Sequence, residues 1–227
     1  MSKVFFSVSM TLDGFIAPDG MDLEHAEDPG YKNWMSRWLD LQAWIFPQRF
    51  FRQNLHLGEG GETGRDNQIA QETFDRTGVS IMGKRMFDGG ERYWPEEAPF
   101  HTPVFVLTHQ VREPWERPGG TTFYFVNDGI ESALARAREV ARGKDIRIAG
   151  GADAIRQYLN AGLIDEFSIA LSPVLFGAGI RLFDGVDVGR LSFGNEEAIH
   201  SPLVTHLGYV IRRAQGEHRA GASHPPG

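Results

Sequence analysis

From about residue 67 onward, short apolar runs alternate with segments of helical length, and this alternation most limits the possible folds. Apolar runs of about four to eight residues predict buried strands, and the longer segments between them predict helices. Such an alternation is typical of a mainly parallel sheet with helices on both faces. Together with an N-terminal run, eight strands are predicted: Val4–Met10, Val79–Met82, Pro103–Thr108, Thr121–Val126, Asp145–Ala149, Glu166–Ser172, Arg190–Ile199 and Leu203–Arg213.

The segments between these strands carry ordinary helix signals. The predicted helices are Asn67–Arg76, a short one from Lys84 to Phe87, one capped by Asp128 that runs to about Arg142, and Ala152–Ala161, closed by Gly162. We therefore expect one α/β domain over residues 1–213, a three-layer α/β/α fold. Its mixed, mainly parallel sheet has eight strands and an antiparallel C-terminal edge. The polar residues 214–227 are predicted to be a disordered tail.

Residues 21–65 depart from the regular pattern and are rich in aromatic rings. Trp34, Trp38 and Leu41 stand at helical spacing, which predicts an amphipathic helix in front of Pro47. This segment can form a lid or wall for a flat substrate, or it can belong to the core or to a dimer contact. Core or contact is the more usual role of such rings.

Composition and motifs exclude several classes of protein. The net charge of -7 and the pI near 5.6 disfavour a general nucleic-acid binder, which needs a basic face. The chain has no cysteine, so disulfides and thiolate ligands are excluded, and we expect a cytoplasmic location. The eight histidines show no metal-ligand spacing, and no serine stands in a GxSxG motif. Residues 58–64 nearly spell GxGxxG, but the last glycine is one place late and no strand precedes it, so we reject that motif.

Three predicted strands end in residues that suit a phosphate site: Met82–Met86 (MGKRM), Leu107–His109 (LTH) and Ala149–Ala152 (AGGA). In open α/β sheets, ligands bind beyond the carboxyl ends of the strands. Glycine lets the backbone approach a phosphate, and the next helix directs free N–H groups and the positive end of its dipole at it. Lysine and arginine can clamp a further phosphate.

Each of these signals has an ordinary structural alternative. Two glycines before a helix are more often a tight turn, and Lys84 and Arg85 can be a solvated pair that binds nothing. Cations oppose the dipole at a helix start, however, and that mild misfit favours a functional role.

Taken in order, these stretches resemble the dihydrofolate reductase-like superfamily, and within it the branch of the RibD C-terminal reductase domain of bacterial riboflavin biosynthesis. The resemblance covers most of the chain outside residues 21–65. Its motifs are SMTLDGFIA (9–17), VSIMGKRMFDGGERYW (79–94), TPVFVLTH (102–109), IRIAGGADAIRQYLNAGLIDEFSIALSPVLFGAGIRLFDG (146–185) and VTHLGYVIRR (204–213).

The resemblance implies NADPH as cofactor, with the two cations facing its 2′-phosphate. The residues that it assigns to the cofactor are Gly83, Lys84, Arg85, Met86, Leu107, Thr108, His109, Gly150, Gly151, Ala152, Asp153 and Ala154. Asp153 departs from the pattern, because a carboxylate beside a pyrophosphate is unfavourable; it can point outward or act as a cap. No metal site is implied.

The substrate side rests on fewer residues. The resemblance places an acidic residue early in the helix before the MGK strand, and Asp66 stands at nearly that spacing; it can donate a proton or simply cap the helix. Asp13 has the same ambiguity, since Asp-Gly is a common turn pair. The other substrate-side residues are Gly14, Phe15, Trp34 and Phe176.

The function that the resemblance implies is a reductase. It would transfer hydride from NADPH to a C=N or polarised C=C bond of a small flat heterocycle of the pterin, pyrimidine or related type. The proton would come from one of the two carboxyl groups or from water, and the protein would be a homodimer. Without a zinc motif there is no deaminase domain, so a riboflavin-pathway role would be that of a stand-alone reductase. The alternative is a non-catalytic NADPH- or nucleotide-binding module on the same fold.

Overall fold

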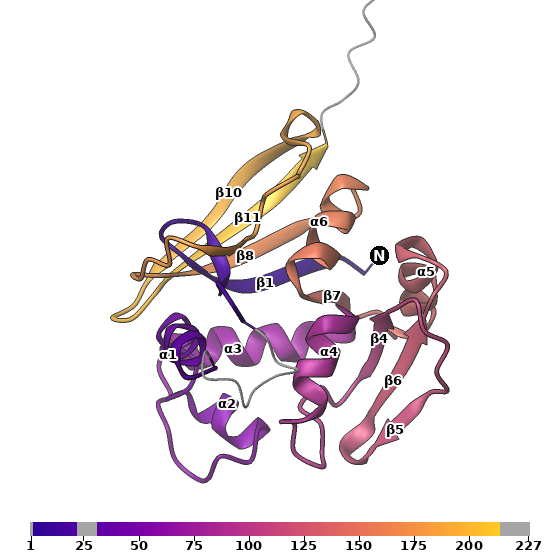
Figure 1. Ribbon diagram of the computed structural model, residues 1–227, viewed down its shortest axis with the longest axis horizontal. Coiled ribbons are helices and arrows are strands. Elements are labelled where there is room, and N and C mark those ends of the chain that lie inside the picture. The colour runs from indigo at the N-terminus through magenta and orange to yellow at the C-terminus, as the bar shows by residue number, and fades with distance from the viewer. Residues whose placement is uncertain (1, 22–30, 214–227) are drawn as a thin grey trace, which may run out of the picture.

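The protein is described here by a computed structural model that covers residues 2–21 and 31–213. A nine-stranded sheet runs through its middle (Figure 1). In chain order these strands are β1 (Val4–Thr11), β3 (Thr77–Gly83), β4 (Pro103–Leu107), β5 (Trp115–Arg117), β6 (Thr121–Val126), β7 (Asp145–Gly150), β8 (Glu166–Ser172), β10 (Leu191–His200) and β11 (Thr205–Arg213).

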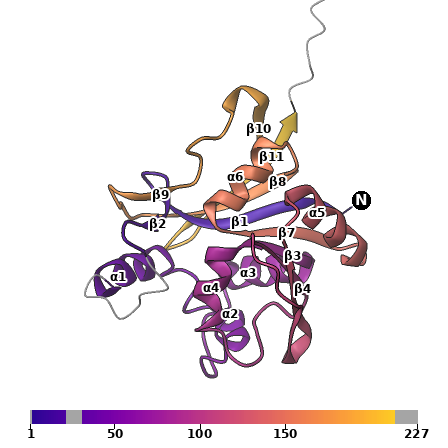
Figure 2. The same ribbon diagram turned by 45° about the vertical axis from the view of Figure 1, so that its right-hand side comes forward.

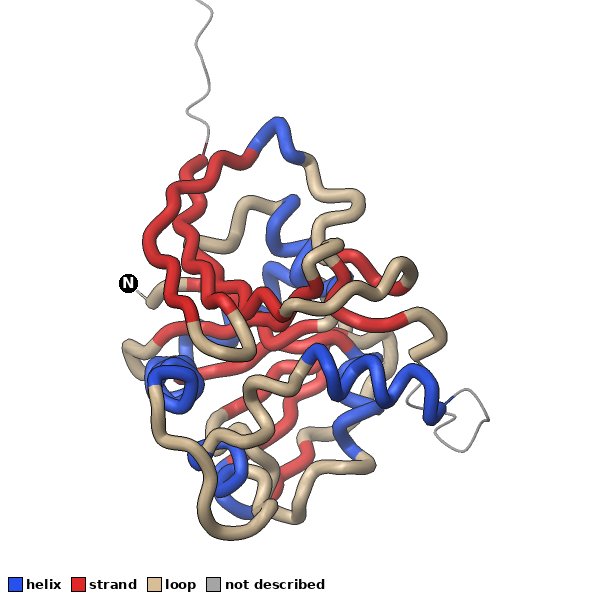
Figure 3. Tube along the Cα trace, turned by 90° about the vertical axis from the view of Figure 1, so that its left-hand side faces the viewer, coloured by secondary structure: helices blue, strands red, loops and turns tan. Residues whose placement is uncertain are grey.

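The order of strands across the sheet is β10-β11-β8-β1-β7-β3-β4-β6-β5. The six strands from β8 to β6 are parallel, and the C-terminal pair β10 and β11 forms an antiparallel edge beside β8. This is the mixed, mainly parallel sheet that the sequence predicts, and Figure 3 shows it as a continuous layer between helices.

The predicted count of eight strands is wrong by one in this sheet. The missed strand, β5, pairs antiparallel with β6 across the turn Pro118–Gly120 and adds a second antiparallel edge. Its three residues are too few to show a period of two, and prolines stand before and after them. Two further short strands, β2 (Phe15–Pro18) and β9 (Gly179–Arg181), form a separate small sheet.

Helices cover both faces of the main sheet. They are α1 (Tyr31–Leu41), α2 (Arg49–Asn54), α3 (Arg65–Arg76), α4 (Lys84–Glu91), α5 (Ile130–Val140) and α6 (Ala152–Asn160). Figure 2 shows α5 and α6 on one side of β1 and β7, with α2, α3 and α4 on the other. No helix in the described part of the chain is both long enough and apolar enough to cross a membrane.

The predicted cap of α5 is wrong. Gly129 occupies the cap position with a φ of 103°, and the helix begins at Ile130. The Asp128 carboxylate instead accepts a hydrogen bond of 2.6 Å from the Arg136 guanidinium. The predicted closure of α6 is confirmed, since Gly162 follows the helix with a φ of 65°.

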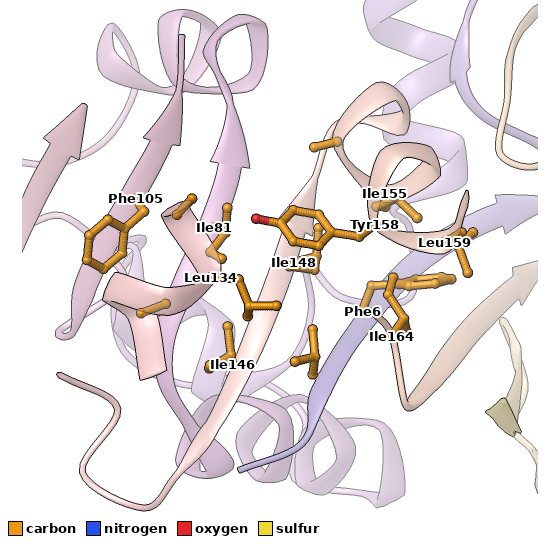
Figure 4. Close-up of a cluster of buried hydrophobic side chains, with 14 of the residues drawn as sticks. Phe6, Ile81, Phe105, Leu134, Ile146, Ile148, Ile155, Tyr158, Leu159 and Ile164 are labelled. Carbon is orange, nitrogen blue, oxygen red and sulfur yellow. The ribbon is translucent and has the colours of Figure 1, made fainter. Parts of the chain in front are cut away.

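The face of β1 and β7 toward α5 and α6 is the main hydrophobic core. Phe6, Ile146 and Ile148 are fully buried there. They pack with α6 side chains, among them Tyr158 (Figure 4). Alternation along the strands puts every second residue into this layer, and the residues between them face α3.

The aromatic residues of the 31–65 segment pack largely within the protein. Trp34 on α1 and Trp44 after it are buried. The rings of Phe46 and Phe51 meet edge to face with centroids 5.4 Å apart. The part of the segment before residue 31 lies outside the described residues, except for Met21, as does the predicted tail at 214–227. For the described rings, the core interpretation fits better than an open substrate wall.

Candidate functional site

The two glycine turns singled out in the sequence lie against each other. Strands β3 and β7 are neighbours, and Met82 pairs with Gly150 at their carboxyl ends. A Cβ atom placed on Gly83 would lie 3.8 Å from the backbone nitrogen of Gly151 and 3.9 Å from the Cβ of Ala154. Residues some 70 positions apart in the sequence thus form one edge of the sheet.

The backbone at this edge is open in the way that a phosphate cradle requires. No atom lies within 4 Å of a Cβ placed on Gly151, which caps α6. Gly150 has a φ of 131°, and a Cβ there would come within 3.1 Å of the Met86 sulfur. The peptide bond between these two glycines is cis. A side chain at either position would take the space through which an anion reaches the backbone.

A helix begins directly after each turn. Gly83 caps α4 and Gly151 caps α6, and neither cap supplies a side-chain hydrogen bond to the first-turn N–H groups. Those groups remain available to a ligand, and the positive ends of both helix dipoles face the same edge. The residues present therefore fit a dinucleotide phosphate group.

The two cations of α4 differ in how they are held. Lys84 Nζ donates to both carboxylate oxygens of Asp88, at 2.5 and 2.6 Å, so its charge is largely compensated. Arg85 is exposed, and its guanidinium donates to the Met21 carbonyl at 2.8 Å. Arg85 is thus the less compensated of the two charges predicted to face a 2′-phosphate.

The carboxylate that conflicts with an anion site points away from it. The Asp153 side chain is 89% exposed and accepts a hydrogen bond of 3.0 Å from Arg156. This arrangement agrees with the outward orientation considered from the sequence and reduces its repulsion of a bound phosphate.

The third predicted stretch lies one strand further along the same edge. Leu107 ends β4 and pairs with Gly83. The Thr108 hydroxyl accepts a hydrogen bond of 3.0 Å from the Gln110 N–H, which orders the turn after the strand, and His109 is exposed. The structure therefore brings all three stretches to one edge.

Asp13 organises a loop instead of facing open solvent as an acid. Its carboxylate accepts hydrogen bonds from the Thr11 hydroxyl and from the N–H groups of Phe176 and Gly177, the last at 2.7 Å. Desolvation raises the pKa of Asp13, but these bonds lower it by more, to about 2. A group that is ionised at neutral pH and held in this way is poorly suited to donate a proton.

The predicted substrate-side rings are buried. Phe15 and Phe176 pack with Leu41 of α1 in a small cluster, and Arg37 lies 5.3 Å above the Phe176 ring. Trp34 is 3% exposed. These rings can support the loop next to the site, while Gly14, with a φ of 86°, provides the turn between β1 and β2.

Asp66 is buried and lies in a polar cluster. Nε2 of His206 lies 2.9 Å from its Oδ1, and the Ser201 hydroxyl donates to its Oδ2 at 2.9 Å. Helix α3 is capped by Gly64, so the capping interpretation of Asp66 is wrong. Both of its carboxylate oxygens have partners from the C-terminal strand pair and the turn within it.

Sequence reasoning missed the residues around Asp66. The Trp44 indole N–H donates to the Ser9 hydroxyl at 2.9 Å, and its ring meets the His206 ring edge to face at 4.8 Å. The available signal was the alternation in β1, where Ser7 and Ser9 alternate with Phe6, Val8 and Met10. The prediction took Val4–Met10 as uniformly apolar and therefore missed the polar face of this strand.

Among residues 2–21 and 31–213, no group of three or more His, Asp or Glu side chains is placed to hold a metal ion.

The fold and the glycine edge together define a dihydrofolate reductase-like protein. The sequence profile of the RibD C-terminal domain matches residues 2–204, so the chain belongs to that family. The uncharacterized protein YyaP of Bacillus subtilis (strain 168) is 41% identical over 109 residues, which are 45% of this chain and 57% of YyaP. The match therefore spans little more than half of that relative.

Solved structures confirm the fold. A putative riboflavin biosynthesis protein from Shewanella sp. PV-4 has a TM-score of 0.60 at 22% identity, covering 94% of this chain and all of the other. A diaminohydroxyphosphoribosylaminopyrimidine deaminase/5-amino-6-(5-phosphoribosylamino)uracil reductase from Thermotoga maritima has a TM-score of 0.57 at 16% identity, covering 93% of this chain and 57% of the other. Dihydrofolate reductase from Enterococcus faecalis, complexed with NADP(H), has a TM-score of 0.50 at 12% identity, covering 92% and 96%.

Proposed function

We propose that this protein is an NADPH-dependent reductase that transfers a hydride to a C=N or polarised C=C bond of a small flat heterocycle, of the pterin, pyrimidine or related type. The observation that carries this proposal is the contact between the Gly83 turn and the Gly150–Gly151 turn, each followed directly by a helix. Family membership and the reductases among its structural neighbours support it.

This chain's residues would bind and orient the cofactor. The open backbone at Gly151 and the first-turn N–H groups of α6 suit the pyrophosphate. Arg85, assisted by Lys84, suits the 2′-phosphate that distinguishes NADPH from NADH. The bound cofactor supplies the hydride, and the protein supplies orientation and electrostatics.

The geometry of the two candidate carboxyl groups favours one of them as the proton donor. Asp13 is ionised and held by a loop, so it is the weaker candidate. Asp66 is buried and shares a hydrogen bond with His206, which makes it the better protein-derived candidate beside water. The role of Asp66 as proton donor is part of the proposed reaction.

The test is a titration with NADPH and, separately, NADH, followed by tryptophan fluorescence. Wild-type protein should bind NADPH much more tightly. Replacing Arg85 with Ala should weaken NADPH binding by about 10- to 100-fold, the range of a lost charge-assisted hydrogen bond, and leave NADH binding nearly unchanged. The matched control is Arg138→Ala at the exposed end of α5, on the other face of the sheet.

Failure of the wild-type protein to bind either nucleotide would overturn the proposal. If NADPH binds, its oxidation is followed with a panel of imines, pterins and enones. Binding without oxidation across the panel would favour the non-catalytic nucleotide-binding module over the reductase.

A further inference from the structure

A lone arginine lies on the central strand of the sheet. Arg147 stands in the middle of β7, the fifth of nine strands in spatial order. Its neighbours in sequence, Ile146 and Ile148, are fully buried in the main core. Alternation therefore directs Arg147 to the opposite face, toward α3.

This guanidinium has almost no partner among the described residues. Nη2 donates to the Ser7 carbonyl at 3.4 Å, which is long for a hydrogen bond, and the Phe74 ring lies 5.3 Å away. Nε is buried without any partner, and no described carboxylate forms a salt bridge with the group. Burial lowers the pKa of Arg147 to about 10, so the side chain is still cationic at neutral pH.

Arg76 provides a comparison on the same face. It lies nearer the amino ends of the strands, over the Phe5 ring. It bonds to Asp145 at 2.6 and 2.9 Å and to Glu166 at 2.6 Å. The fold therefore supplies carboxylates to the arginine that stabilises it and none to Arg147. An uncompensated cation with a buried, unpartnered Nε is costly, which points to a role outside stability.

The surroundings of Arg147 are polar and partly open. Ser80 pairs with it on β3, and Ser7 pairs with Ser168 across β1 and β8. None of these three hydroxyls has a hydrogen-bonding partner within the described part of the chain. Arg147, Ser7 and Ser168 are only half-buried although they lie on central strands. Ser80 is buried. We call these four residues the polar patch, and its half-buried members are partly exposed to solvent.

The polar patch also differs from the polar cluster around Asp66. Both oxygens of Asp66 are already bonded, to His206 and Ser201. The groups left without partners on this face are therefore hydrogen-bond donors, one of them cationic, and they would be satisfied by a negatively charged acceptor.

We propose that Arg147 binds a carboxylate of the substrate, so that the small heterocycle reduced by the protein carries an acid group. One guanidinium without a second uncompensated cation balances a single negative charge, which suits a carboxylate better than a phosphate dianion. Arg147 precedes Gly150 by three residues, about 10 Å along a strand. A molecule whose acid group and reducible bond are separated by that distance can bridge the polar patch and the glycine edge. That the ligand is a substrate rests on the proposed reductase function.

The test measures binding of benzoate and of inorganic phosphate to the protein with and without NADPH, by calorimetry. Wild-type protein should bind benzoate, and Arg147→Met should weaken that binding at least tenfold. Arg147→Lys should fall between them, because it keeps the charge and loses the planar fork. Arg138→Met removes a distant positive charge and should change nothing. NADPH affinity should be equal in all four proteins.

A second measurement separates ligand binding from a structural role. Arg147→Met should unfold at a higher denaturant concentration than wild type, because an uncompensated, partly buried charge is removed. Benzoate binding that is absent, or unchanged in Arg147→Met, would overturn the proposal, as would a preference for phosphate. A lower unfolding midpoint together with lost NADPH affinity would also overturn it, by showing that Arg147 maintains the fold. If wild type binds benzoate through Arg147 but never binds NADPH, the reductase function fails while the anion site stands.

Discussion

The two faces of strands β1 and β7 have opposite characters. On the face toward α5 and α6, Phe6, Ile146 and Ile148 are fully buried in an apolar layer. On the face toward α3, the intervening positions carry Ser7 and Arg147, both half-buried. The same backbone thus supports a dry core on one side and a polar surface on the other.

This difference separates the residues that stabilise the fold from those that cost stability. Hydrocarbon burial is the main favourable term in folding, and the α5–α6 face supplies it. A half-buried arginine without a carboxylate opposes folding, so its presence needs another explanation. We propose that the α3 face is the functional face of the sheet.

The largest expected effect comes from adjacent positions on β1. Phe6→Ala should lower the free energy of unfolding by about 3–5 kcal/mol, because it leaves a cavity in the main core. Ser7→Ala on the other face should change it by no more than about 0.5 kcal/mol. Denaturant unfolding measures both. Equal losses at the two positions would show that the faces do not differ as described.

Asp66 is expected to give a smaller loss. Asp66→Ala removes the carboxylate partner of His206 and one of the two acceptors of the Ser201 hydroxyl, which also bonds to the Val204 carbonyl; because both side chains stay buried, this should cost about 2–3 kcal/mol. Asp153→Ala, on an exposed side chain, is the control and should cost almost nothing. If Asp66→Ala unfolds as wild type does, the cluster is not structural, and Asp66 would be left to catalysis alone.

Most of the fold could be predicted from the sequence because the strands are apolar and the helices between them are regular. All eight predicted strands are present, with ends that differ by up to two residues. The strand missing from the predicted main sheet, Trp115–Arg117, is too short for a pattern and exists through its pairing with β6. The strands β2 and β9 of the small sheet, four and three residues long, were missed for the same reason. Helix α2 was missed because Pro47 and the dense aromatic residues obscured it.

The site was predictable only where its residues form local motifs. The Gly83 and Gly150–Gly151 turns are such motifs, and their contact follows from the neighbouring strands β3 and β7. The partners of Asp66 come from residues 201 and 206, more than 130 positions away, and no local pattern reveals such a contact. Arg147 was visible in the sequence as one cation between two isoleucines, but its lack of a counterion is a property of the folded structure.

The smallest expected effect concerns the loop at the carboxyl end of β1. Hydrogen bonds hold the pKa of Asp13 at about 2, below the value of about 3.9 for an unfolded chain. A depressed folded pKa stabilises the protein above about pH 4, and this stabilisation disappears as the pH falls through about 2. After allowance for solvent screening, it is worth at most about 1 kcal/mol. The difference in unfolding free energy between wild type and Asp13→Asn should therefore be largest at pH 5 and shrink toward pH 2. Asp184→Asn, at an exposed position with no described partner, is the control. A difference that grows on acidification would mean that Asp13 is protonated in the folded protein, and would return it to the candidates for proton donor on the functional face.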